Sequence, residues 1–152
     1  MFVFRSIIIL SLLFMSSLAQ ANSTTELDNM LKEAKGQVVY LDFWASWCGP
    51  CRKSFPWLNA MQAKYQAQGF KVISVNVDTE RAAAEKFLQT LPAHFAVIYD
   101  PNGKVARQFK LKGMPSSYLF NKQGKIVSAH VGFIDNKKSQ YENEIIKLTQ
   151  QK

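Results

Sequence analysis

Apolar and polar residues follow two different periods along this chain, and their alternation predicts its elements. Residues 38–44 are almost continuously apolar, which is typical of a central strand buried on both faces. Residues 51–67 instead repeat apolar side chains at helical spacing, and Gly69 stands where that helix should stop. The pattern therefore predicts a buried strand that leads directly into a long helix.

The same two periods continue on both sides of this unit. Further strands are predicted at 72–77, 95–99, 117–121 and 126–131, and further helices at 24–35, 80–90, 105–109 and 136–150. A strand-helix-strand half followed by a hairpin and a helix indicates an α/β fold. We expect a central mixed β-sheet flanked by helices on both faces.

The first 21 residues have the pattern of an export signal. Arg5 precedes an apolar stretch at 6–18, and Ala-Gln-Ala at 19–21 is the small-x-small pattern of a signal-peptidase site. The apolar stretch is shorter than the about 20 residues that a membrane-spanning helix needs. We expect a cleaved signal peptide at 1–21, one folded domain at 22–152 and a periplasmic or otherwise extracytoplasmic location. The alternative is an uncleaved N-terminal membrane anchor.

The chain carries a formal net charge of +8, which raises the question of nucleic-acid binding. Its lysines are scattered, and no recognised nucleic-acid motif accompanies them. The positive charge favours solubility and attraction to acidic surfaces or partners, so we expect no nucleic-acid function.

The two cysteines of the chain, Cys48 and Cys51, stand two residues apart between the buried strand and the long helix. A structural disulfide at this spacing would close too small a loop to constrain the unfolded chain much. A zinc site needs about four ligands, and only His94 and His130 remain as soft candidates. A c-type haem would need histidine where Arg52 stands. The pair is therefore predicted to be a redox dithiol, with no metal and no cofactor.

Position relative to the helix predicts a different role for each cysteine. The helix N-terminus stabilises negative charge on Cys48 and lowers the pKa of its thiol, which makes Cys48 the expected nucleophile. Cys51 is then the resolving thiol, close enough to attack the mixed disulfide. Of the neighbouring aromatic residues, Phe43 and Trp44 are expected in the core. Trp47 is expected to be exposed as a contact for partners.

Asp42 interrupts the apolar strand and is the third candidate catalytic residue. A carboxylate in a buried strand is costly unless it is paired or protonated, so its pKa is expected to be raised. It could then exchange a proton with Cys51 during resolution. The structural alternative is that Asp42 faces a polar edge. His94 and His130 are expected to be structural rather than catalytic.

Three segments resemble the thioredoxin superfamily. Residues 40–51 are similar to the active-site segment of thioredoxin, 113–120 to its cis-proline loop and following strand, and 122–127 to the next hairpin. The export signal and the residues at 79–110 make the chain most similar to the exported TlpA/ResA/CcmG-like thiol-disulfide oxidoreductases. The resemblance implies a thioredoxin-like fold.

The resemblance also implies roles for residues around the cysteines. Asp42 matches the buried aspartate that transfers protons, and Met114 and Pro115 match the loop that faces the disulfide and offers backbone groups to a partner strand. Gly49 and Pro50 between the cysteines resemble the reducing members of the superfamily. The chain departs from its relatives at two positions. Ser54 stands where the exported branch often has glutamate, and Ser74 stands at the expected position of a thioredoxin lysine.

These expectations combine into an exported, monomeric reductase of protein disulfides. Its expected partners are disulfide-containing exported proteins, with apocytochrome c as a candidate, and a membrane thiol electron transporter as the reductant. The alternatives are a disulfide oxidase or isomerase of the same fold and a non-catalytic, redox-switched binding module.

Overall fold

The computed structural model of the protein describes residues 22–151. The predicted signal peptide at 1–21 lies outside the described residues. Between residues 22 and 151, none of the helices combines the length and the apolar character that crossing a membrane requires.

Five strands form one mixed sheet in the order β3-β2-β1-β4-β5. The first three pair in parallel, whereas β4 runs antiparallel to both β1 and β5. All seven residues of β1 are buried, which confirms the predicted central strand. The strands are β1 (Val38–Trp44), β2 (Phe70–Asn76), β3 (Ala96–Tyr99), β4 (Ser116–Phe120) and β5 (Ile126–Val131).

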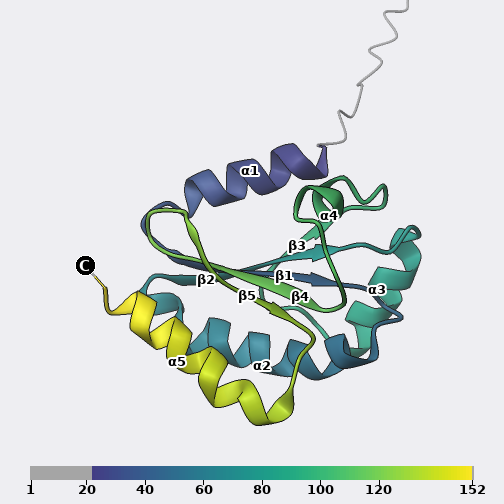
Figure 1. Ribbon diagram of the computed structural model, residues 1–152. Coiled ribbons are helices and arrows are strands. Elements are labelled where there is room, and N and C mark those ends of the chain that lie inside the picture. The colour runs from purple at the N-terminus through teal and green to yellow at the C-terminus, as the bar shows by residue number, and fades with distance from the viewer. Residues whose placement is uncertain (1–21, 152) are drawn as a thin grey trace, which may run out of the picture.

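Helices cover both faces of this sheet, as predicted (Figure 1). The helices α2 and α3 make successive right-handed crossovers in one direction along the sheet, which places both on the same face. α5 packs on that face too, while α1 and α4 pack on the other. The helices are α1 (Ser23–Glu33), α2 (Gly49–Tyr65), α3 (Arg81–Thr90), α4 (Lys104–Gln108) and α5 (Lys138–Thr149).

Some boundaries differ from those predicted, for local reasons. α2 begins at Gly49 rather than at Cys51, because proline is tolerated in the first turn of a helix and Cys48 serves as the N-cap. β2 begins at Phe70, directly after Gly69, whose left-handed backbone ends the 3-10 turn Gln66–Gln68. A second 3-10 turn, Asp135–Lys137, delays the start of α5 to Lys138.

Alternate residues of β1 face opposite layers of the core, as the pleat of a strand requires. Val39, Leu41 and Phe43 pack in the layer under α1 and α4. Tyr40 and Trp44 pack in the layers under α2, α5 and α3. By this alternation Asp42 faces the helix that begins at the cysteines.

Candidate active site

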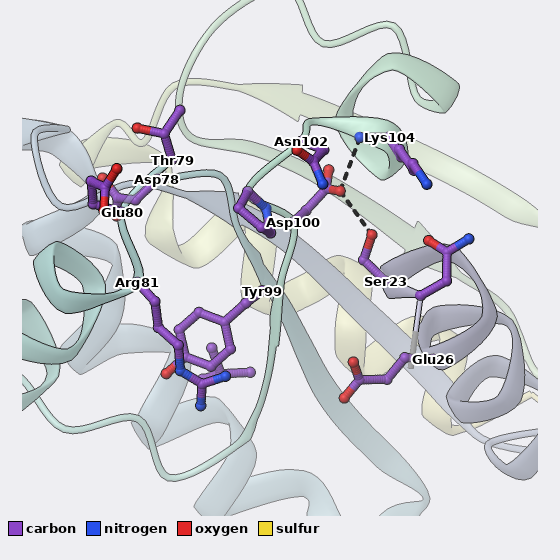
Figure 2. A pocket seen from close by; sticks show the side chains of 13 residues that line it. Ser23, Glu26, Asp78, Thr79, Glu80, Arg81, Tyr99, Asp100, Asn102 and Lys104 are labelled. Atoms are coloured by element: carbon purple, nitrogen blue, oxygen red, sulfur yellow. Dashed lines mark hydrogen bonds between the residues drawn. The ribbon is translucent and has the colours of Figure 1, made fainter. Parts of the chain in front are cut away.

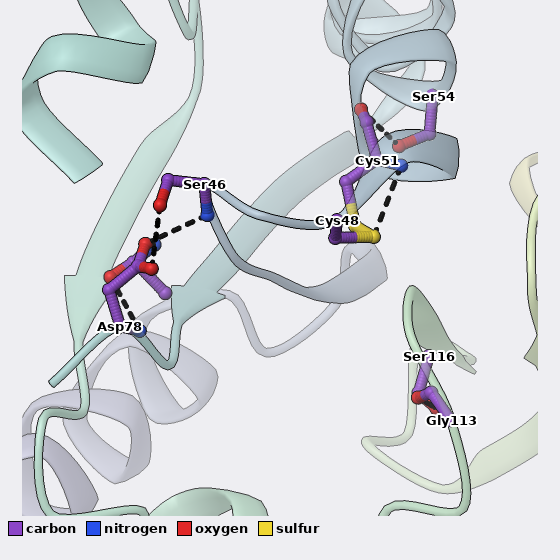
Figure 3. Close-up of a disulfide and its surroundings, with 8 residues drawn as sticks. Ser46, Cys48, Cys51, Ser54, Asp78, Gly113 and Ser116 are labelled. Atoms are coloured by element: carbon purple, nitrogen blue, oxygen red, sulfur yellow. Dashed lines mark hydrogen bonds between the residues drawn. A yellow bond between two sulfur atoms is a disulfide. The ribbon is translucent and has the colours of Figure 1, made fainter. Parts of the chain in front are cut away.

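The cysteines and the loop that contains Pro115 meet at one edge of the sheet. β1 ends at this edge and is followed by Cys48, whereas β4 runs the other way and therefore begins there. The pairing of Phe43 with Ser116 fixes the two segments side by side. Figure 3 shows Gly113 and Ser116 on the segment that lies opposite the disulfide, separate from the helix that carries Cys51.

Cys48 and Cys51 are joined by a disulfide in this structure. Cys48 is the N-cap of α2, and its Sγ accepts a hydrogen bond of 3.2 Å from the backbone N–H of Cys51. Cys48 is 4% exposed and Cys51 is fully buried. In the reduced protein the same N–H and the helix dipole would stabilise a thiolate at Cys48. The arrangement thus makes the two sulfurs chemically unequal.

The loop before the disulfide is held by Asp78, which follows β2. Its carboxylate accepts hydrogen bonds from the N–H of Ser46 at 2.9 Å, the hydroxyl of Ser46 at 2.8 Å and the amide of Asn76 at 2.7 Å (Figure 3). Sequence reasoning assigned Asp78 no role. The available signal was a carboxylate directly after a buried parallel strand, at the edge where the carboxyl ends of such strands meet.

Replacing Asp78 with alanine should lower the free energy of unfolding by about 1–3 kcal/mol, because the buried amide of Asn76 and the partly buried N–H of Ser46 lose their acceptor. Urea denaturation of the oxidised protein measures this loss. Asp28→Ala is the matched control, since Asp28 is exposed on α1. Equal stability of the two variants would show that Asp78 does not anchor the loop.

Aromatic side chains support the disulfide from within the core. Trp44 is fully buried, and its ring centroid lies 4.8 Å from those of both Phe55 and Phe87. These rings belong to the same buried cluster as Cys48 and Cys51. Trp47, in contrast, is 69% exposed beside the disulfide. The predicted division into core and exposed aromatic residues is confirmed.

Asp42 lies on the central strand and is 2% exposed. Burial raises the pKa of its carboxyl well above the ordinary value for aspartate. Its Oδ2 has no hydrogen-bond partner among residues 22–151. Asp42 therefore lies buried in the sheet rather than at a solvent-exposed edge, and its part in proton transfer stays a prediction. Ser74 of β2 pairs directly with Asp42. This pairing agrees with the expectation that Ser74 stands at the position of the thioredoxin lysine.

The loop before β4 contains a cis peptide bond between Met114 and Pro115, which confirms the expectation from the resemblance. The hydroxyl of Ser116 donates to the carbonyl of Gly113 at 2.7 Å, and the N–H of Gly132 donates to the carbonyl of Pro115 at 2.7 Å. Met114 is half-buried and packs against the cluster that contains both cysteines. The structure therefore brings this loop and the disulfide together.

Three other residues that the sequence singled out lie next to the site or away from it. Ser54 is buried in α2 and donates to the carbonyl of Cys51 at 3.0 Å. His94 is exposed before β3. His130 pairs with Glu144 of α5 at 2.9 Å.

A pocket of about 800 Å³ lies between the start of α1 and the loops after β2 and β3 (Figure 2). One of its two buried carboxylates, Asp100, already accepts hydrogen bonds from the hydroxyl of Ser23 and the N–H of Lys104. The guanidinium of Arg81 lies over the ring of Tyr99 and pairs with Glu85. These internal contacts indicate a structural polar cluster, so we assign it no catalytic role.

The model of the Redoxin family matches residues 16–145. The chain belongs to the Redoxin family. The thiol-disulfide oxidoreductase ResA of Bacillus cereus strain ZK / E33L is 33% identical to this redoxin over 119 residues, which are 78% of this chain and 68% of the relative. ResA of Bacillus subtilis strain 168 is 31% identical over 102 residues, which are 67% and 57% of the two chains.

Solved structures with the same fold agree with the family. A Chlorobium tepidum protein described as a thiol:disulfide interchange protein DsbE is 51% identical to this redoxin, with a TM-score of 0.77 over 78% of this chain and 84% of that one. StoA from Bacillus subtilis is 26% identical, with a TM-score of 0.62 over 72% and 82% of the two chains. These likenesses confirm the thioredoxin-like fold and the ResA/CcmG-like branch. This redoxin is a thiol-disulfide oxidoreductase.

Proposed function

We propose that this redoxin is an extracytoplasmic reductase of protein disulfides that works through a Cys48–Cys51 dithiol cycle. The main support for this proposal is that the two sulfurs differ in their burial and in their hydrogen bonding. Cys48 caps α2 and receives the N–H of Cys51, next to the exposed Trp47, whereas Cys51 is fully buried. Such an arrangement suits one sulfur for attack on a partner and the other for an internal step.

The proposed cycle transfers two electrons from the dithiol to the partner. The Cys48 thiolate attacks one sulfur of the partner's disulfide, forms a mixed disulfide and releases the other sulfur as a thiolate, which takes a proton from water. Cys51 then loses its proton and attacks the Sγ of Cys48. The Cys48–Cys51 disulfide forms, and the second partner sulfur leaves as a thiolate that is protonated in turn.

Asp42 is the proposed proton acceptor for Cys51. Its raised pKa means that the carboxylate holds a proton more tightly than an ordinary aspartate does, so it can take the proton of a buried thiol and later release it. The position of Asp42 on β1, facing the layer under α2, supports this role.

Partner binding is proposed for the surface around the disulfide. Trp47 would offer an exposed apolar contact, and Gly49 and Pro50 leave the approach to Cys48 free of large side chains. Met114 and Pro115 would pair through their loop with an extended partner segment, as in β-strand addition. This mode reads the partner's backbone more than its side chains, so several client proteins are compatible with it.

The electron flow proposed here runs from the protein to its clients. The Gly49-Pro50 dipeptide supports it, and the signal pattern at 1–21 supports an extracytoplasmic location of the 22–152 domain. We propose disulfide-containing exported proteins as clients, with apocytochrome c as a candidate, and a membrane thiol transporter as reductant. The protein would act as a monomer.

Two measurements test this function. Reduction of insulin with dithiothreitol as electron donor should proceed with multiple turnovers, whereas a redox-switched binding module would give none. Equilibration with glutathione should give a potential near that of thioredoxin, about −270 mV. A potential near that of a strong oxidase, about −120 mV, would instead assign the opposite direction.

A further inference from the structure

Asp42 stands between two hydroxyl groups in the sheet. Ser74 of β2 and Ser117 of β4 occupy the positions directly opposite Asp42 on its two sides. Directly paired residues of neighbouring strands place their side chains on the same face, about 4.5–5.5 Å apart at Cβ in an antiparallel pair. Both serines are buried. The buried carboxylate therefore has two candidate hydrogen-bond donors.

The hydroxyl of Ser74 is already committed elsewhere. It donates to the carbonyl of Ala96 at 3.1 Å and accepts from the indole N–H of Trp44 at 3.2 Å. Because a serine hydroxyl has a single proton, Ser74 could donate to Asp42 only by abandoning Ala96. That exchange would leave the partly buried carbonyl of Ala96 without the hydroxyl donor of Ser74, which makes it unfavourable.

The hydroxyl of Ser117 is placed differently. Its Oγ lies 2.9 Å from the Oη of Tyr40, and either oxygen can donate in this pair. Burial, and secondarily the nearby Asp42, raise the pKa of Tyr40, so Tyr40 retains its proton. When Tyr40 donates to Ser117, the proton of Ser117 remains available to a third group.

Resting on the function proposed above, we propose that Ser117, oriented by Tyr40, donates the hydrogen bond that stabilises the ionised carboxylate of Asp42. Rotation of the Ser117 side chain toward Asp42 would accompany ionisation. Ser117 is then a positioning residue for the proton exchange between Asp42 and Cys51. Ser74, although symmetrically placed, does not share this role.

Few other titratable groups face this part of the core. Tyr40 lies on β1 itself, Cys51 lies on α2, and His130 lies on β5 opposite Ser117. α5 contributes Tyr141 and Glu144, and Glu144 is engaged by His130 at 2.9 Å. Because these other titratable groups lie near Asp42, the test has to observe the Asp42 carboxyl itself.

Titration of the Asp42 carboxyl by ¹³C NMR in the reduced full-length domain tests the proposal directly. Ser117→Ala should move the midpoint upward by about one pH unit, because the charged form loses a donor. Ser74→Ala is the matched control and should leave the midpoint in place. An unchanged midpoint in Ser117→Ala, or an equal shift in both variants, would overturn the proposal.

A second pair of variants keeps the test valid if alanine perturbs folding. Ser117→Thr retains the hydroxyl and adds a methyl group, whereas Ser117→Val has the shape of that threonine with a methyl group in place of the hydroxyl. Both residues suit a strand. Threonine should keep the parent midpoint and valine should shift it upward; equal midpoints would contradict the proposal. The NMR titration does not depend on catalytic turnover, so it tests the Ser117 contact separately from the proposed function. If the midpoint of Asp42 shifts but the pH profile of resolution by Cys51 does not change, the role of Asp42 in the cycle is contradicted. The hydrogen bond from Ser117 to Asp42 is then still supported.

Discussion

Replacing Cys48 with serine is expected to reduce insulin reduction to the uncatalysed background, a loss on the order of a thousandfold or more. The serine hydroxyl is not ionised near neutral pH, and the chain contains no third cysteine that could attack instead. The assay is insulin reduction with dithiothreitol, compared with the parent at equal concentration. Turnover retained in Cys48→Ser would contradict the assignment of the nucleophile.

Cys51→Ala tests the other half of the same assignment. This variant should attack partner disulfides and then remain linked to them, because nothing resolves the mixed disulfide from within. Non-reducing electrophoresis and mass spectrometry of the trapped species would also identify the clients. Alkylation of the reduced parent should label Cys48 faster than the fully buried Cys51. Faster labelling of Cys51 would reverse the two roles.

Replacing Asp42 with asparagine should stabilise the protein at neutral and alkaline pH by about 1–3 kcal/mol, because the buried side chain can then no longer ionise. The pKa of Asp42 is higher in the folded state than in the unfolded state, since burial disfavours the charge. The parent is therefore most stable below the unfolded pKa and loses stability as the pH rises through the folded one. Urea denaturation across this pH range should show that the difference in the free energy of unfolding between Asp42→Asn and the parent widens as the pH rises.

The catalytic consequence of Asp42→Asn should fall on one step alone. Attack by Cys48 needs no proton from Asp42 and should survive, whereas resolution by Cys51 should slow and lose its pH dependence. Stopped-flow measurement of the two steps separates them. Asp28→Asn, at an exposed position of α1, is the control. Stability curves and pH profiles parallel to the parent's would leave Asp42 a structural residue.

The sequence predicted those elements best whose own residues determine them. β1 and β5 have the predicted limits, because a continuous apolar run and a hairpin are local patterns. The start of α2 was missed by two residues, since it depends on the cap made by the Cys48 side chain. The beginning of α5 depends on a 3-10 turn that has no distinct period of its own.

The residues of the site also divide into those that local sequence predicts and those that depend on distant contacts. The spacing of the cysteines and their place between a strand and a helix predicted the redox pair, and the apolar context of Asp42 predicted its burial. The cis bond before Pro115 required the resemblance, because most such bonds are trans. The roles of Asp78 and Ser117 could not be predicted, because each arises from contact with a residue far along the chain. Ser46 precedes Asp78 by 32 residues, and the register of β4 against β1 places Ser117 beside Asp42.

The unequal burial of the three tryptophans gives this redoxin a built-in optical reporter. Trp47 is 69% exposed, whereas Trp57 is 8% exposed and Trp44 is fully buried in the cluster that contains the disulfide. A partner that covers Trp47 would shift its fluorescence to shorter wavelengths. Reduction of the disulfide would instead change the quenching of Trp44. Docking and electron transfer would therefore leave separate spectral signals in one unlabelled sample.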